Sequence, residues 1–338
     1  MTRILLSDVR ERVSPLGEHV LVSDEVAAAL AAARPVVALE TSLVTHGLPL
    51  PQCVDVALEA EGRIRTGGAV PATIAISEGR MVVGLSDDEV DRLARAPDTA
   101  KATRANLSTV IARRRTAGTT VSATMLIAEA CGIDVFATGG LGGVHRGAAG
   151  DVRRSLSGTL DISADLEELA RTPVNVVCAG PKSILDVPLT LEYLETNGVP
   201  LMTLGADDVP GFYSRSSGAR TPLRIDDIAE AAAIIATQRA LGLAAGTVTC
   251  VPLAAEDAIP LPVIESAIGR ALDEAGPEIR GGAVTPYLLE RLHKITAGAT
   301  LQANLKLICN NAEMAARLAV ALDRSCSAVH RPHILRHR

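Results

Sequence analysis

The chain has 338 residues, of which 48% are hydrophobic, and its formal net charge at pH 7 is −6. Because it contains only three tyrosines, two phenylalanines and no tryptophan, it lacks both the positive charge that attracts a polynucleotide and the aromatic rings on which bases stack, so no polynucleotide partner is expected. Its six cysteines form no CxxC pair, and no apolar run approaches the roughly 20 residues of a membrane span, which predicts a cytoplasmic protein with reduced thiols and no membrane association.

Short apolar runs alternate with stretches of helical periodicity along the first two thirds of the chain. The expected elements are a strand at 36–39, a helix at 52–65, a hairpin of 72–76 and 81–84, helices at 87–95 and 122–130, a strand at 135–137, a helix at 163–171, a strand at 174–179 and a helix at 185–196. Helices at 226–243, 259–274 and 301–322 follow. This order predicts a three-layer α/β/α fold with a largely parallel or mixed central sheet and a helical C-terminal third. We expect one domain over residues 1–323 and a disordered tail over residues 324–338.

Lysine is rare in this chain, with four lysines among 33 basic residues. One of them, Lys182, follows a predicted strand in the segment Gly180-Pro181-Lys182-Ser183. Arginine stays protonated in proteins, whereas a lysine in a desolvated pocket can lose its proton and attack a carbonyl or a sugar C1 as a Schiff-base nucleophile. Lys182 is therefore the first catalytic candidate, and the alternative is a surface lysine that happens to follow a strand. A second lysine, Lys101, is interpreted by default as a lysine on the surface of a helix.

Functional groups in open α/β sheets gather beyond the carboxyl ends of strands, and two polar clusters have this position. Glu40 ends an apolar strand, where burial would suit it to act as a general acid or base; the alternative is a helix cap or an arginine partner. The segment from Thr138 to Gly147 contains five glycines together with His145 and Arg146. It matches neither a P-loop nor a dinucleotide fingerprint, so we expect a monophosphate or sugar pocket there, or else a glycine hinge.

Two further clusters stand at predicted helix starts. Asp161 and Asp165 flank Ser163, and the three either cap the helix or bind a hard cation such as Mg²⁺ or Mn²⁺ mostly through water. Residues 118–124 offer hydroxyls and free backbone amides, which is a common arrangement for anion binding.

Taken in order, these segments resemble the pseudouridine-5′-phosphate glycosidase family, also called the indigoidine synthase A family. One matching segment is Val177-Cys178-Ala179-Gly180-Pro181-Lys182-Ser183. The other matching segments are 38–42, 46–49, 68–75, 118–121, 136–140, 142–147, 161–166, 184–186 and 212–218. The resemblance extends from about residue 16 to residue 322, and so many ordered motifs do not coincide by chance.

The resemblance implies reversible cleavage of the C–C glycosidic bond of pseudouridine 5′-phosphate to uracil and ribose 5-phosphate, by a homotrimer that uses a divalent metal, usually Mn²⁺. It implies that Lys182 forms the Schiff base, that Glu40 is the acid or base, and that Asp161 is the metal-associated carboxylate. The implied substrate contacts are Lys101, Val121, Ser163, Ala164, Asp165, His145 and Asn304. A C-glycoside has no leaving oxygen or nitrogen to protonate, and an iminium gives the electrons of the broken bond somewhere to go.

Two alternatives keep the same pocket. One is a Schiff-base enzyme that acts on another sugar phosphate or in pigment (indigoidine-type) biosynthesis, and the other is a sugar-phosphate-binding protein without turnover. The chain also departs from the family in residues 147–160, which are several residues longer than the family pattern. An exposed loop there would leave the site unchanged, because insertions in surface loops cost little.

Overall fold

A twelve-stranded sheet crosses the computed structural model, which describes residues 3–8, 15–146, 161–275 and 284–329. Its strands are β1 (Arg3–Leu5), β2 (Val20–Ser23), β3 (Val36–Leu39), β4 (Val70–Ser77), β5 (Arg80–Val83), β6 (Ala100–Ala102), β7 (Ala117–Thr119), β8 (Val135–Ala137), β10 (Asn175–Cys178), β12 (Leu201–Leu204), β13 (Leu223–Ile225) and β14 (Thr247–Cys250). They lie in the order β1-β2-β5-β4-β3-β8-β10-β14-β12-β13, and β7 joins β6 to the side of β4. A separate antiparallel ladder pairs β9 (Val144–His145) with β11 (Leu185–Asp186).

The sheet is parallel from β4 through β3, β8, β10, β14 and β12 to β13. Antiparallel pairs occur on its other side, where β5 and β7 both pair with β4 and where β1 pairs with β2. The predicted largely parallel or mixed sheet is therefore confirmed. Parallel strands carry their carboxyl ends to one edge of a sheet, so the loops after β3, β8 and β10 meet there.

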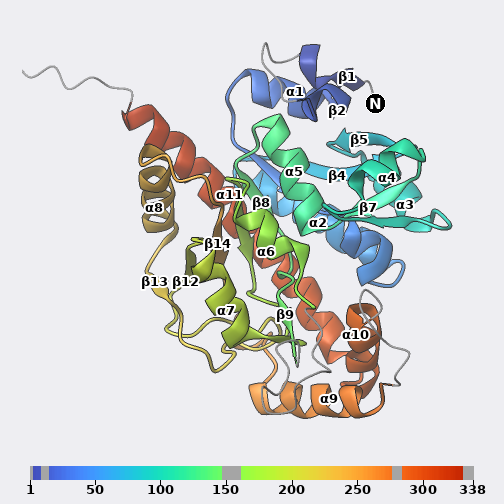
Figure 1. The fold of residues 1–338 in the computed structure, drawn as a ribbon, viewed down its shortest axis with the longest axis vertical. Coiled ribbons are helices and arrows are strands. Elements are labelled where there is room, and N and C mark those ends of the chain that lie inside the picture. Colours follow the sequence, from blue (N-terminus) through green and yellow to red (C-terminus); the bar gives the residue numbers. More distant parts are fainter. Residues whose placement is uncertain (1–2, 9–14, 147–160, 276–283, 330–338) are drawn as a thin grey trace, which may run out of the picture.

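Helices cover both faces of the sheet (Figure 1). They are α1 (Asp24–Ala31), α2 (Gln52–Thr66), α3 (Asp87–Arg95), α4 (Leu107–Ala112), α5 (Val121–Cys131), α6 (Ala164–Leu169), α7 (Val187–Thr196), α8 (Ile228–Ala240), α9 (Leu261–Asp273), α10 (Val284–Ile295) and α11 (Ala299–Val329). Side chains alternate between two cores: Val36 and Ala38 of β3 pack with α5 and α6, whereas Val37 and Leu39 pack with α2 and α11. This alternation is the period-two pattern of a strand buried on both faces. No helix in the described ranges is both long and apolar enough to cross a bilayer.

Most of the predicted elements are confirmed, and the differences have simple causes. The predicted helix at 185–196 begins only at Val187, because residues 185–186 pair with β9 as β11. Strand β14 was not predicted; its four residues are all buried, and it lies between β10 and β12 inside the predicted helical third. Helix α11 continues to Val329, beyond the predicted end at 322. The expected loop at 147–160 and the part of the predicted tail from residue 330 onward lie outside the described residues.

Candidate active site

Three neighbouring parallel strands bring the main catalytic candidates together. Glu40 directly follows β3, Thr138 directly follows β8, and Lys182 lies just after β10. Because β8 pairs with both β3 and β10, these loops are adjacent at one edge of the sheet. Two adjoining cavities lie there, and both are lined by Glu40, Ser42, Lys101 and Lys182.

The two cavities differ in chemistry. The first, called here the hydroxyl cavity, is completed by Thr103, Thr120, Val121, Ser122, Gly142, His145, Ser163, Ala164, Asp165 and Leu185. The second, called here the apolar cavity, is completed by Leu43, His46, Gly47, Leu48, Thr138, Gly139, Gly140, Phe212, Leu289, Asn304 and Ile308. Of the ten predicted site residues, only Asp161 lines neither cavity, so the sequence motifs converge on one place.

Glu40 is held rigidly at the boundary of the two cavities. Its side chain is largely buried, at 6% exposure. The hydroxyl of Thr138 donates a hydrogen bond to Oε1, and the hydroxyl of Ser42 donates one to Oε2. Two hydroxyl donors fix the orientation of the carboxylate, which is what a group that transfers a proton at a defined atom requires.

The two lysines of the site influence each other. Lys101 lies on β6, opposite Gly118 of β7. Burial lowers the pKa of Lys101 and the charge of Lys182 lowers it further, while Glu40 and Asp165 act in the opposite direction. Burial and repulsion by Lys182 therefore both favour the neutral form of the Lys101 amine.

Arg146 holds the loop that carries Lys182, although we expected it only as a donor to an anion. Its Nη2 donates to the carbonyl of Ser183 at 2.9 Å, and its Nε donates to that of Leu185 at 3.3 Å. Its other bonds, at 2.7 and 2.8 Å, go to both oxygens of Glu265 on α9. The Lys182 amide in turn donates to the Leu141 carbonyl at 3.0 Å. The guanidinium thus positions the backbone on the C-terminal side of Lys182.

The glycine-rich loop and the starts of α5 and α6 are joined by Asp165. Its Oδ1 accepts from the amide of Ser122 at 3.0 Å, and its Oδ2 accepts from that of Gly142 at 2.9 Å. A Cβ at position 142 would lie 2.6 Å from Cβ of Ser163 and 2.7 Å from this carboxylate, which explains the glycine. The Gly142 amide therefore binds the carboxylate of Asp165 and is not available to a phosphate. Ser163 caps α6, as its hydroxyl accepts from the Asp165 amide at 3.2 Å.

Val121, Ala164 and Asn304 complete the set of predicted contacts. Val121 is 1% exposed and opens α5, so its amide has no acceptor within the helix, and the residue lines the hydroxyl cavity. Ala164 is the first residue of α6 and lines the same cavity. Asn304, near the start of α11, lines the apolar cavity instead.

His145 and Asp161 lie side by side at the edge of the hydroxyl cavity. The distance from Nδ1 of His145 to Oδ2 of Asp161 is 4.0 Å. Burial lowers the pKa of His145, the charge of Asp161 opposes this, and the charge of Lys182 lowers it further, so the neutral imidazole is favoured. Among the described residues no group of three or more His, Cys, Asp or Glu side chains could hold a metal ion. One carboxylate beside a neutral imidazole fits a hydrated ion with few protein ligands, and does not fit an ion enclosed by protein.

The sequence did not single out Ser42, Thr138 or His46 as site residues. Burial lowers the pKa of His46, and the charge of Lys101 adds to the effect; its Nδ1 lies 2.6 Å from the Thr45 hydroxyl. All three were parts of the recognised segments: Ser42 and Thr138 stand beside strand ends, and His46 lies in the short helix Leu43–Gly47 that follows β3. That position was the available signal, but it does not say which of several neighbouring polar side chains turns inward.

Known proteins resemble this chain over most of its length. The sequence model of the family described as “Indigoidine synthase A like protein” matches residues 25–321. A pseudouridine-5′-phosphate glycosidase of Solibacter usitatus is 50% identical over 306 residues, which cover 90% of this chain and 100% of that protein. One of Caldanaerobacter subterraneus is 47% identical over 304 residues, with 90% and 96% covered.

Two solved structures are also similar to this chain over most of its length. An indigoidine synthase A-like protein from Thermotoga maritima has a TM-score of 0.78 at 36% identity, with 86% of this chain and 94% of that chain covered. The prealnumycin C-glycosynthase AlnA, solved in complex with ribulose 5-phosphate, has a TM-score of 0.83 at 37% identity, with 91% and 98% covered. By sequence and by structure, this chain belongs to the indigoidine synthase A-like family.

Proposed function

We propose that this protein reversibly cleaves the C–C glycosidic bond of pseudouridine 5′-phosphate to give uracil and ribose 5-phosphate, through a Schiff base on Lys182. The observation that carries the proposal is the position of Lys182 and Glu40 in the shared wall of two chemically different cavities. The names of the relatives, pseudouridine-5′-phosphate glycosidases at 47–50% identity, support the same substrate.

The two cavities suit the two halves of this substrate. The phosphorylated sugar fits the hydroxyl cavity, where the Val121 amide at the start of α5 and the amine of Lys101 can meet its phosphate. The uracil fits the apolar cavity, where Phe212 offers an aromatic surface and Asn304 a polar side chain. The bond between them then crosses the wall that contains Lys182 and Glu40.

The proposed steps conserve atoms and electrons. The neutral amine of Lys182 forms a bond to C1′ as the ring oxygen leaves and takes a proton. The nitrogen lone pair then expels the uracil, whose C5 takes the bonding electrons and a proton, and an iminium remains between Lys182 and C1′. Glu40 is the proton donor at the ring oxygen or at C5. Water hydrolyses the iminium, which releases ribose 5-phosphate and regenerates the amine.

Product analysis tests the proposal. Incubation with pseudouridine 5′-phosphate and Mn²⁺ should release uracil and ribose 5-phosphate in equal amounts, as measured by chromatography. Borohydride with ribose 5-phosphate should add one pentose phosphate to the protein, and peptide mapping should place it on Lys182. A sugar-phosphate-binding protein without turnover would be stabilised by ribose 5-phosphate but would give no adduct.

A second function keeps the Schiff base and changes the substrate. It is favoured by the likeness to the prealnumycin C-glycosynthase, which was solved with ribulose 5-phosphate. In that case the adduct would form with a pentose phosphate, yet pseudouridine 5′-phosphate would release no uracil. The same two assays therefore separate the two functions.

Lys101 gives a pH-dependent prediction. Its pKa is lowered from its ordinary value of 10.5, so its positive charge disappears as pH rises through a value below 10.5. Ribose 5-phosphate stays doubly ionised over this range, because the second phosphate pKa is about 6. Loss of the charge-assisted hydrogen bond from Lys101 to the phosphate should weaken the binding of ribose 5-phosphate roughly tenfold to a hundredfold.

Calorimetry would measure the dissociation constant of ribose 5-phosphate between pH 7.5 and 11. The protein used is the Lys182→Arg variant, because it cannot form the covalent adduct. Adding Lys101→Arg should move the loss of binding to higher pH, because arginine keeps its proton. A pH profile that is identical in the two proteins would exclude Lys101 as the phosphate ligand.

We further propose that Asp161 is the direct protein ligand of a Mn²⁺ ion, with His145 close by and water completing the coordination. When bound, the ion would supply positive charge near the substrate oxygens. Asp161→Asn should weaken Mn²⁺ binding at least about tenfold, as measured by electron paramagnetic resonance of the free ion. Asp186→Asn is the matched control, because Asp186 caps α7 through the Leu189 amide and asparagine caps equally well. Equal affinities in the two variants would remove Asp161 from the metal site.

We also propose that the protein is a homotrimer, as the family resemblance implies, and that it is cytoplasmic, as its cysteines suggest. The five cysteines that the structure describes are all buried. Reduced thiols of this kind suit the cytoplasm.

A further inference from the structure

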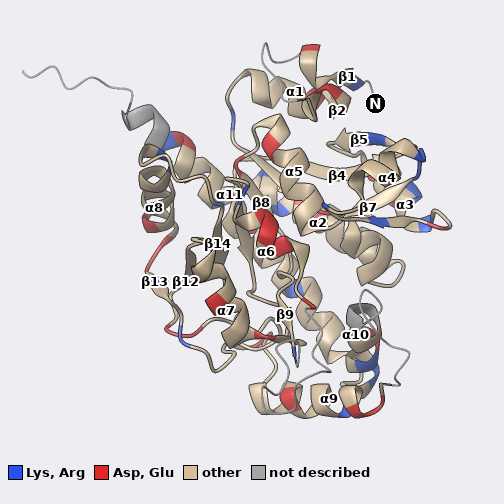
Figure 2. Cartoon of the chain, in the orientation of Figure 1, with Lys and Arg blue, Asp and Glu red and all other residues tan. Residues whose placement is uncertain are grey.

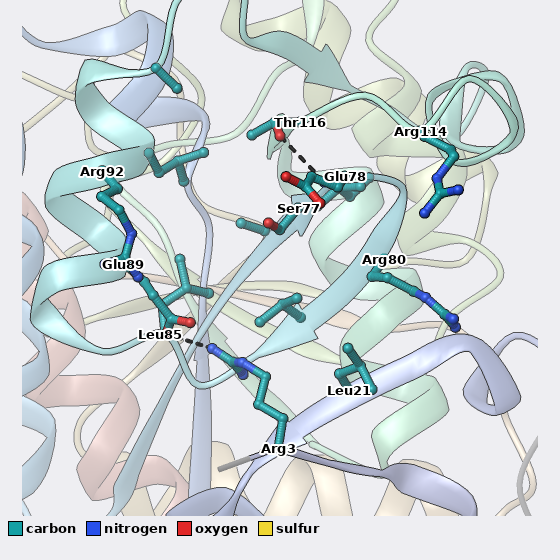
Figure 3. Close-up of a pocket in the computed structure, with 15 residues that line it drawn as sticks. Arg3, Leu21, Ser77, Glu78, Arg80, Leu85, Glu89, Arg92, Arg114 and Thr116 are labelled. Atoms are coloured by element: carbon teal, nitrogen blue, oxygen red, sulfur yellow. Dashed lines mark hydrogen bonds and ion pairs between the residues drawn. The ribbon is translucent and has the colours of Figure 1, made fainter. Parts of the chain in front are cut away.

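A larger cavity, of about 600 Å³, lies between β5, α3 and the loop before β7 (Figure 3). We infer that it is a second binding site, for a small phosphate monoester that carries an apolar or ring-containing group. It shares no lining residue with the hydroxyl cavity or the apolar cavity. The inference is therefore independent of the proposed function.

The floor of this cavity is apolar. It consists of Leu21, Ala75, Ile76, Val82, Leu85, Leu93 and Ala96, contributed by β2, β4, β5, α3 and the turns beside them. The volume lies within the range of roughly 300–1,000 Å³ that is typical of small-molecule sites. A ligand that fills it must therefore bring an apolar or ring-shaped body.

The rim is cationic. Figure 3 shows Arg3 and Arg92 on one side of the floor and Arg80 and Arg114 on the other. Arg3 is paired with Glu89 at 2.6 Å, whereas Arg80, Arg92 and Arg114 are exposed and form no ion pair with any residue that the structure describes. Three guanidiniums without carboxylate partners around one cavity are suited to an anion with several oxygens.

Charge indicates how many negative charges the ligand carries. Four arginines and two glutamates, Glu78 and Glu89, line the cavity, which leaves two positive charges in a chain whose net charge is −6. Figure 2 shows basic residues gathered around β5 and the loops next to it. A phosphate monoester carries about −1.5 to −2 at pH 7 and would balance this charge.

The backbone holds two of these arginines in place. Glu78 and Arg114 both adopt left-handed conformations, with φ of 49° and 50°, which persist in such residues only where the surroundings impose them. The hairpin turn at Gly79 is docked on the Arg114 loop, because its amide donates to the Arg115 carbonyl at 3.0 Å. A Cβ on Gly79 would lie 2.6 Å from the Ile111 carbonyl and 2.8 Å from Cα of Arg114. This contact brings Arg80 and Arg114 to the same side of the cavity.

Calorimetric titration with phenyl phosphate tests the inference, because this probe joins a phosphate monoester to an apolar ring. We expect the double variant Arg80→Ala/Arg114→Ala to bind phenyl phosphate at least about tenfold more weakly than the wild type does. Arg113→Ala is the matched control: Arg113 is exposed, adjacent in sequence and absent from the lining, so its affinity should stay within about twofold of wild type. Lys101→Gln, in the other site, should leave this binding in place.

Two results would overturn the inference. One is equal phenyl phosphate affinity in the double variant and in Arg113→Ala, provided that thermal melting shows both to be folded. The other is no binding of phenyl phosphate to wild type; a changed sedimentation mass of the double variant would then identify the cavity as a contact between copies of the chain. Phenol, which lacks the phosphate, should bind at least about tenfold more weakly than phenyl phosphate.

Discussion

Lys182→Arg should lower uracil release from pseudouridine 5′-phosphate by about 10⁴-fold or more. Arginine keeps the length and positive charge of the side chain but cannot give up its proton, so it cannot form the bond to C1′. Single-turnover kinetics with uracil detection measure the effect. Borohydride trapping with ribose 5-phosphate should lose its mass increase at the same time.

Lys306→Arg is the control for this substitution, because Lys306 is exposed on α11 and lines neither cavity of the site. It should retain full turnover and full trapping. If Lys182→Arg also kept turnover, the Schiff-base proposal would be wrong, whatever the substrate. If it lost trapping but kept binding of ribose 5-phosphate, the loss would be assigned to chemistry and not to folding.

The fold was predictable where hydrophobic periodicity is unambiguous. Strand β3 and helix α3 have the bounds expected from their patterns, and Ser86 and Glu89 form the capping box that starts α3. Strand β14 was missed because its four residues, Thr247–Cys250, stand alone between two long helical patterns. Its strand structure comes from pairing with β10 and β12, and such nonlocal partners are not visible in a short window of sequence.

The same limit applies to the site. The chemistry of Lys182 and Glu40 could be predicted from residue type and position after a strand. The partner of Glu40 could not, since Thr138 is 98 residues away in the sequence. Asp165 illustrates the opposite problem: its motif implied a substrate contact, and in the folded chain both of its carboxylate oxygens accept from backbone amides. Which polar groups bind the protein itself and which bind a ligand depends on tertiary geometry.

Glu40→Gln should lower the rate of uracil release by roughly 10²–10⁴-fold and leave ribose 5-phosphate affinity nearly unchanged. Glutamine has the same shape and can still interact with the hydroxyls of Thr138 and Ser42, which now donate to the carboxylate. It cannot deliver a proton, and this is the property that the variant removes. Single-turnover kinetics measure the rate, and calorimetry measures the affinity.

The matched control is Glu61→Gln. Glu61 is also buried, at 5% exposure, and accepts from a threonine hydroxyl, that of Thr73, but it lines neither cavity of the site. Burial raises the pKa of Glu61, so replacing it by a neutral amide should be tolerated and turnover should persist. If both variants lost activity equally, Glu40 would matter only as part of the buried structure. If Glu40→Gln alone lost activity but still formed the borohydride-trapped adduct, its proton would be needed at C5 of the uracil. Joint loss of turnover and trapping would assign it to proton transfer at the ring oxygen, because the bond from the amine of Lys182 to C1′ forms as that oxygen leaves.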